Sequence, residues 1–131
     1  MNILLDTHIW LWSLLDKPRI KKRLTTVLED PANQLWLSSI SVWEAMLLMQ
    51  KGNIESDIDP ALWIRQALAK GFVMEATMTH EVSINSRLIN LPHKDPADRF
   101  IAATALVHGF TLATADEHLL NCRSIRTIPN R

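Results

Sequence analysis

The chain has 131 residues, 47% of them hydrophobic, which is enough for one domain with a packed core. Its 14 basic and 14 acidic residues give zero formal net charge, which argues against nucleic-acid binding by bulk charge but leaves a local basic surface open. The single cysteine, Cys122, excludes an internal disulfide and fits a reducing cytoplasm. No apolar run reaches the roughly 18 residues of a membrane-spanning helix. The N-terminus does not resemble a signal peptide, so we expect a cytoplasmic protein with no membrane partner.

Strand-like and helix-like segments alternate along the chain. Apolar and β-branched runs predict strands near residues 2–5, 35–37, 72–75, 111–114 and 125–128. Helical periodicity and capping residues predict helices near residues 7–15, 18–29, 40–51, 60–70, 79–90, 96–108 and 116–121. Residues 53–60 form the clearest loop. This alternation is typical of an α/β domain, here one domain over residues 1–131, with a mainly parallel sheet of about five strands between helices.

Four acidic residues occupy comparable places in four separate segments. Asp6 follows the first strand, Asp116 follows the fourth, Glu44 lies within the helix of residues 40–51, and Asp98 lies near the start of the helix of residues 96–108. The carboxyl ends of parallel strands share one edge of the sheet, where ligands bind. Carboxylates gathered there without cations repel one another. Binding of a hard divalent metal such as Mg²⁺ is the simplest explanation for carboxylates brought together in this way.

Each acid also has a purely structural interpretation. Asp6 and Asp116 can each cap the helix that follows. Asp95 precedes Pro96, so it is either a helix cap or an auxiliary acid of the site. Glu44 lies among apolar residues, which places it either at the solvent edge of its helix or in a site.

Four polar neighbours of these acids have two interpretations as well. Thr7, Ser39 and Thr114 can contact a substrate or orient a carboxylate, or they can cap helices and form turns. Arg99 follows the third acid directly. Its guanidinium can pair with a site carboxylate, hold a phosphate, or form a structural ion pair.

Four short motifs, in order, resemble those of PIN-domain nucleases and in particular of VapC-type toxins of type II toxin–antitoxin pairs. They are Leu4-Leu-Asp-Thr-His8, Ser39-Ile-Ser-Val-Trp-Glu-Ala45, His93-Lys-Asp-Pro-Ala-Asp-Arg-Phe-Ile-Ala-Ala-Thr-Ala105 and Leu112-Ala-Thr-Ala-Asp116. The resemblance covers almost the whole chain and implies a PIN-like three-layer α/β/α sandwich. The family's metal-binding and catalytic acids match Asp6, Glu44, Asp98 and Asp116.

The resemblance also implies an activity and partners. It implies an endoribonuclease that uses Mg²⁺ or Mn²⁺ and activated water, a homodimer, and inhibition by a cognate antitoxin. A catalytically silent module that binds RNA or protein remains an alternative. So does a DNA nuclease, because nothing identifies a contact to the ribose 2′-hydroxyl. A phosphatase with Asp6 as nucleophile is disfavoured, since His8 stands where such enzymes have a second acid.

Basic and aromatic residues suggest further surfaces. The densest basic segment contains Lys17, Arg19, Lys21, Lys22 and Arg23 and is either a solvated helix face or a contact for RNA phosphates. The five tryptophans favour core or dimer packing over base stacking. An apolar groove built partly from Trp10, Leu11 and Leu14 could receive an antitoxin helix. The histidines (8, 80, 93, 108 and 118) lack zinc-site spacing, and Cys122 has no predicted catalytic role.

Overall fold

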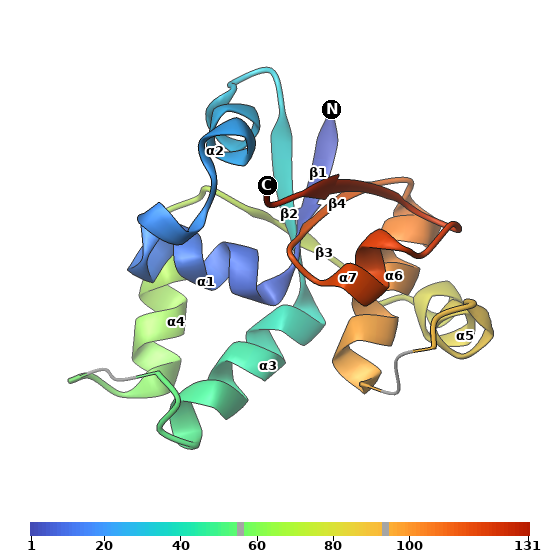
Figure 1. Ribbon diagram of the computed structural model, residues 1–131. Coiled ribbons are helices and arrows are strands. Elements are labelled where there is room, and N and C mark those ends of the chain that lie inside the picture. The colour runs from blue at the N-terminus through green and yellow to red at the C-terminus, as the bar shows by residue number, and fades with distance from the viewer. Residues whose placement is uncertain (55–56, 93–94) are drawn as a thin grey trace.

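The computed structural model describes residues 1–54, 57–92 and 95–131 (Figure 1). Its strands are β1 (Asn2–Leu5), β2 (Gln34–Ser38), β3 (Met74–Ala76), β4 (Thr111–Thr114) and β5 (Arg126–Pro129). Its α-helices are α1 (Thr7–Leu15), α2 (Lys22–Glu29), α3 (Ser39–Gln50), α4 (Pro60–Ala69), α5 (His80–Leu88), α6 (Pro96–His108) and α7 (Glu117–Leu120), with a 3₁₀ helix, η1, at Lys17–Arg19. Residues 55–56 of the predicted loop, and His93 and Lys94 of the third motif, lie outside the described residues.

Across the described residues, five parallel strands form one sheet in the order β3-β2-β1-β4-β5. The chain extends the sheet from β1 towards β3 and then returns to place β4 on the other side of β1. The strand order therefore reverses between β1 and β4. In open parallel sheets this point leaves a crevice at the carboxyl ends of the two strands.

The sheet is buried on both faces, which explains the continuous apolar run of its central strand. Ile3 and Leu5 pack into one core cluster with residues of α1, α2, α3 and α4, whereas Leu4 packs into a second cluster with residues of α6 and α7. Figure 1 shows α1, α3 and α4 on one side of the sheet and α5, α6 and α7 on the other. The predicted three-layer α/β/α arrangement is confirmed.

The prediction of one helix over residues 18–29 is wrong. The chain forms η1, then passes through extended backbone at Ile20 and Lys21, and only then enters α2. Ile20 is buried against the core, which requires the chain to turn at this point. The side chain of Asn130 stabilises the break, because its amide accepts from the Lys21 N–H at 2.8 Å and donates to the Arg19 carbonyl at 3.0 Å.

The third strand lies two residues later than its apolar residues suggest. Gly71 has a φ of 74°, the left-handed conformation that ends α4, and Phe72 is 69% exposed. Pairing with β2 starts only at Met74, opposite Trp36. The apolar character of Phe72 therefore belongs to the surface and not to the strand. None of the described helices is long and apolar enough to cross a membrane.

Candidate metal centre

Asp6 lies at the switch point between β1 and β4. Its N–H donates to the Ala113 carbonyl at 3.0 Å, which continues the β1–β4 pairing by one residue. One carboxylate oxygen accepts from the Thr7 N–H at 2.8 Å, so Asp6 does cap α1. The other accepts from the Thr114 hydroxyl at 2.6 Å. The side chain is only 6% exposed, and these two bonds fix its orientation.

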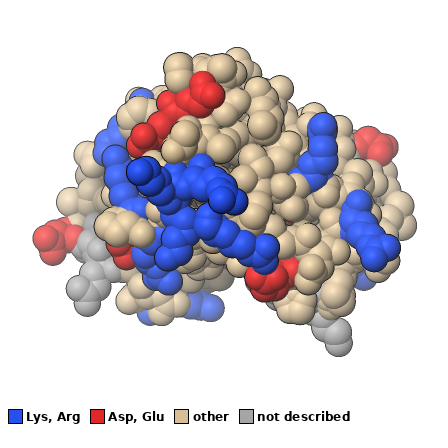
Figure 2. Space-filling view, turned by 45° about the horizontal axis from the view of Figure 1, so that its top comes forward, with Lys and Arg blue, Asp and Glu red and all other residues tan. Residues whose placement is uncertain are grey.

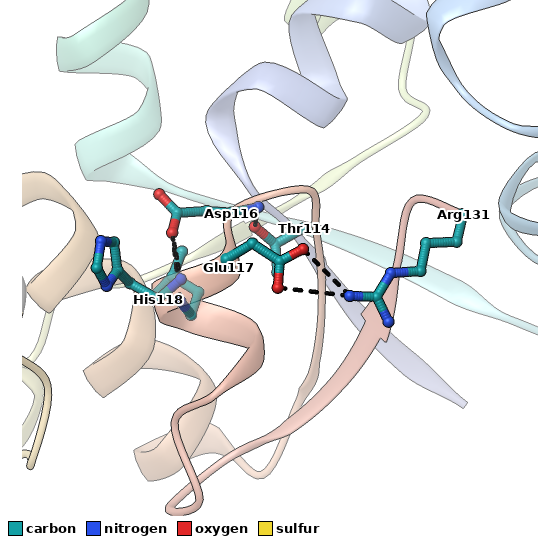
Figure 3. A network of polar contacts seen from close by, with 6 residues as sticks. Thr114, Asp116, Glu117, His118 and Arg131 are labelled. Carbon is teal, nitrogen blue, oxygen red and sulfur yellow. Dashed lines mark hydrogen bonds and ion pairs between the residues drawn. The ribbon is translucent and has the colours of Figure 1, made fainter.

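Thr114 connects two of the predicted acids. The same hydroxyl that donates to Asp6 accepts the Asp116 N–H at 3.0 Å. Asp116 then caps α7, with one carboxylate oxygen accepting from the N–H of His118 at 2.8 Å (Figure 3). Figure 3 also shows the adjacent ion pair between Arg131 and Glu117. The orienting role predicted as one alternative for Thr114 fits this geometry.

Asp98 lies in the first turn of α6 and is 8% exposed, so it is the most buried acid of the described chain after Asp6. Asp95 caps the same helix by accepting the Ala97 N–H at 3.0 Å. Both predicted interpretations of Asp95 therefore remain compatible with its position. The cap is formed, and the carboxylate also contributes to the electrostatics of Asp98.

Glu44 reaches the same region from α3, where it is half-buried. The first turns of α1 and α3 are joined by a hydrogen bond from the Thr7 hydroxyl to the Ser41 hydroxyl, 2.9 Å long and fully buried. Ser41 lies three positions before Glu44, on the same side of α3. Sequence reasoning missed Ser41, although this helical spacing points to it. It selected Ser39, but the cap of α3 is Ser38, whose hydroxyl accepts the Ile40 N–H.

The acids lie near enough to one another for their negative charges to repel. The pKa of Asp98 is raised from 3.8 to about 8, first by burial and then by repulsion from four carboxylates, in decreasing order Asp6, Asp95, Asp116 and Glu44. The structure thus places the other three predicted acids, and Asp95, near enough to Asp98 to repel its negative charge.

The pKa of Asp6 is raised as well. Burial is the main cause, and the charge of Glu44 adds to it. The hydrogen bonds from Thr114 and Thr7 and the charge of His8 act in the opposite direction, but burial outweighs them. Two buried carboxyls that resist ionisation therefore stand at the centre of the cluster.

The donor set fits a hard divalent cation. Carboxylate oxygens are the ligands that Mg²⁺ prefers, and a cation would offset the repulsion that raises the pKa of Asp98. No three carboxylate, imidazole or thiolate groups of the described residues are arranged to hold an ion together. Mg²⁺ does not need such a cage, because it keeps several waters and takes one or two carboxylates directly.

Arg99 makes contacts that its place next to Asp98 did not predict. Its guanidinium donates to the carbonyls of Ser86 and Leu91 at 2.8 Å, of Ile89 at 3.0 Å and of Arg87 at 3.4 Å. These carbonyls belong to the end of α5 and the segment after it. The contacts join α5 to α6 and hold the helix that carries Asp98.

An apolar groove of about 730 Å³ lies between α1, α2, α4 and the strands β2 and β3. Trp10 and Leu14 line it, as predicted, whereas Leu11 is buried in the core and does not. Phe72 and Met74 line the same groove and are exposed apolar side chains. Trp10 is only 3% exposed, so it also supports the core.

The family model of the PIN domain matches residues 3–123. The chain belongs to the PIN-domain family. Within that family it is similar to Ribonuclease VapC22 of Mycobacterium tuberculosis, with 31% identity over 130 residues that cover 97% of this chain and 96% of that protein. The resemblance in the four motifs is thereby confirmed over nearly the full length of this PIN domain.

Solved structures of toxin–antitoxin proteins share the fold of this PIN domain. VapBC2 from Rickettsia felis, bound to a DNA fragment from its promoter, matches with a TM-score of 0.73 and 15% identity, over 98% of both chains. DNA-bound VapBC from Salmonella typhimurium matches with a TM-score of 0.70 and 19% identity, over 100% of this chain and 99% of that one. At these identities the likeness establishes the fold.

Proposed function

We propose that this PIN domain, working as one unit over residues 1–131, is a metal-dependent endoribonuclease and the toxin of a toxin–antitoxin pair. The observation that supports the proposal is Asp6 at the switch point of the sheet, with Glu44 and Asp116 near enough, like Asp6, to repel the buried carboxyl group of Asp98. The near full-length similarity to a protein named a ribonuclease supports the same chemistry. Parallel-sheet switch points are binding crevices, which supports a substrate position there.

The residues of the chain have distinct parts in the proposed reaction. Asp6 and Asp98 supply buried carboxylates that hold Mg²⁺ or Mn²⁺, and Asp116 and Glu44 complete the negative site directly or through water. A divalent ion held there would supply charge to orient the phosphate, activate water and stabilise the departing oxygen. Thr114 holds the Asp6 carboxylate in place. No covalent protein nucleophile is required, because water attacks the phosphorus.

The partners follow from the same proposal. RNA is the substrate, and the structural relatives solved as VapBC complexes support a cognate antitoxin. The apolar groove offers that antitoxin a surface of suitable chemistry. The homodimer and the cytoplasmic location remain predictions.

The decisive experiment measures RNA cleavage during titration with Mg²⁺ and Mn²⁺, and after removal of metal with EDTA. Asp6→Asn should lower cleavage by at least about a hundredfold, because the change removes the charge that holds the cation while it keeps the shape of the side chain. The matched control is Asp57→Asn, since Asp57 is an exposed carboxylate away from the cluster. Circular dichroism should show that both variants are folded.

Three results would contradict the proposal in different ways. Full activity of Asp6→Asn would remove Asp6 from the mechanism. Retention of RNA without cleavage at any metal concentration would favour the binding module. Faster cleavage of single-stranded DNA than of RNA of the same sequence would favour the DNA nuclease.

A further inference from the structure

A group of exposed cations surrounds the break between η1 and α2. We define the basic surface by its members, Lys17, Arg19, Lys21, Lys22 and Arg23. Figure 2 shows Lys and Arg side chains merging into one area on the face that carries α2 and the C-terminal end of the chain. None of the five has an ion-pair partner among the described residues. The chain has zero net charge, so this positive excess is local.

The basic surface lacks the compensation that an ordinary solvated helix face has. Residues four positions after Lys21 and Lys22 are threonines and not acids, so no i,i+4 ion pairs form. The first turn of α2 contains no acid, and Lys21 at the cap position makes no side-chain cap bond. Cations at this end of a helix are repelled by its dipole. The cluster therefore costs stability, and a bound anion would offset that cost.

The basic surface is fixed in position relative to the acidic cluster. The Asn130 side chain bonds the backbone of Arg19 and Lys21. The Asn130 N–H donates to the Thr114 carbonyl at 3.1 Å, and the Thr114 hydroxyl donates to Asp6. Asn130 thus links the two sites through backbone and side-chain hydrogen bonds.

Two aromatic side chains on α1 lie between the acidic cluster and the basic surface. His8 and Trp12 lie four residues apart on one side of α1, with ring centroids 5.9 Å apart. The Arg19 guanidinium lies 4.4 Å from the centroid of the Trp12 ring and has no hydrogen bond or ion pair within the described chain. His8 is two residues from Asp6. A strip of rings and cations thus follows α1, whose nine residues span about 14 Å, from the acids to the basic surface.

The rings of this strip face away from the apolar groove, whereas Lys17 of the basic surface lines it. At 3.6 residues per turn, His8 and Trp12 lie on the side of α1 opposite to Trp10 and Leu14, which line the groove. A partner bound in the groove and a ligand on the strip would therefore contact opposite sides of the same helix.

We propose that single-stranded RNA lies along the exposed side of α1, with bases against His8 and Trp12 and phosphates on the basic surface. This inference rests on the proposed function and adds to it the path of the substrate beyond the cleavage site. A surface that combines cations with aromatic rings suits single strands, since phosphates need the charge and bases need the flat faces. Arg19 supplies several unused donors in a planar fork, which suits a phosphate.

The test measures fluorescence anisotropy of a short single-stranded RNA with the full chain in EDTA, where cleavage is suppressed. The double variant Arg19→Gln/Lys21→Gln should bind at least about tenfold more weakly at low salt. Its plot of log affinity against log salt should be shallower by about 1.4, because two phosphate contacts are lost. The matched control, Arg65→Gln/Arg87→Gln, removes the same charge from α4 and α5 and should bind as the wild type does.

A second variant tests the aromatic part. Trp12→Leu keeps an apolar side chain against the core but removes the ring, so affinity should fall about tenfold with an unchanged salt slope. Thermal unfolding of the RNA-free proteins establishes that each variant is folded. Lys22→Gln replaces Lys21→Gln in the double variant if that one unfolds.

The outcomes separate this inference from the nuclease proposal. Equal affinities of the double variant and its control would overturn the path, even if the wild type cuts RNA with Mg²⁺. Loss of RNA binding in the variants would support the path, even if no metal gives cleavage and the nuclease proposal fails. The proposed RNA path would also be overturned if the variants lost duplex DNA binding as strongly as single-stranded RNA binding. The same holds if they lost affinity for the antitoxin or for a second copy of the chain but kept their affinity for RNA.

Discussion

Opposing electrostatic effects act on the side-chain carboxyl group of Asp98. Its place in the first turn of α6 favours the charged form, because the positive end of the helix dipole is worth about 0.3–1 kcal/mol there. Burial and the neighbouring carboxylates favour the neutral form more strongly, and they raise the pKa of Asp98 to about 8. The ionised carboxylate that a metal requires is therefore the unfavourable form in the metal-free protein.

We predict that Asp98→Asn stabilises the metal-free protein at pH 8, by on the order of 2 kcal/mol, because it removes a buried charge. The folded-state pKa lies above the unfolded value of 3.8, so the folded chain binds the extra proton between about pH 4 and 8. Wild-type stability should therefore fall as pH rises through this window, and the raised pKa of Asp6 acts in the same direction. Urea unfolding at pH 5 and pH 8 measures the difference, which should be smaller in Asp98→Asn.

The stabilisation of the protein by added Mg²⁺ gives a second test of this account. Mg²⁺ should raise the unfolding temperature of the wild type at pH 8 more than that of Asp98→Asn, because it binds the ionised carboxylates of the folded state. Asp57→Asn is again the control. A wild type whose stability is the same at pH 5 and pH 8 would show that Asp98 is ionised without metal and would refute this account.

At the scale of elements, one guanidinium bonds α6 to the end of α5 and the segment after it. The last turn of any helix leaves carbonyls without partners inside that helix. Arg99 satisfies two in α5 and two just after it. Its planar fork of donors suits this task, whereas a lysine ammonium reaches fewer acceptors at once.

We predict that Arg99→Lys lowers the free energy of unfolding by about 1.5–3 kcal/mol, because charged hydrogen bonds to partly buried carbonyls are lost. Amide hydrogen exchange should accelerate first in α5, whose end loses its partners. Arg87→Lys, on the exposed side of α5, is the matched control. Unchanged stability combined with loss of RNA cleavage would instead assign Arg99 to the substrate, the alternative that its sequence position also allows.

On the scale of the whole molecule, the layers create two surfaces of opposite chemistry around α1. The apolar groove follows from packing α1 against α2, α4 and the edge of the sheet. The basic surface arises where Asn130 fixes the chain between η1 and α2, and it meets the groove at Lys17. An inhibitor in the groove would therefore leave the exposed side of α1 accessible but would reach the basic surface at Lys17.

We predict that Phe72→Glu weakens binding of the protein encoded next to this gene, the expected antitoxin, by at least about tenfold. Phe72 is 69% exposed in the groove, so a charge there disrupts an apolar contact and leaves the core intact. Calorimetric titration measures the affinity. Leu88→Glu, at a 73% exposed position on α5, is the matched control, and equal affinities of the two variants would exclude the groove as the docking site.

The sequence by itself determined the order of strands and helices and the identity of the candidate acids. Local signals were sufficient for these, because apolar periodicity defines each element and Asp6, Asp98 and Asp116 each stand at the start of a helix. The parallel sheet followed from the alternation of elements. The break in the predicted helix at Ile20 could not be predicted from the sequence. It depends on burial of the Ile20 side chain and on Asn130, more than 100 residues away.

Only the tertiary structure decided what these residues contact. The Thr114 hydroxyl bonds both Asp6 and Asp116, and the Ser41 hydroxyl connects α3 to α1. The Arg99 guanidinium bonds a carbonyl of α5, although Asp98 is its neighbour in sequence. The physical reason is that hydrogen bonds and burial act between segments that are far apart in the chain. A residue type limits which bonds a side chain can make, but packing selects the partner.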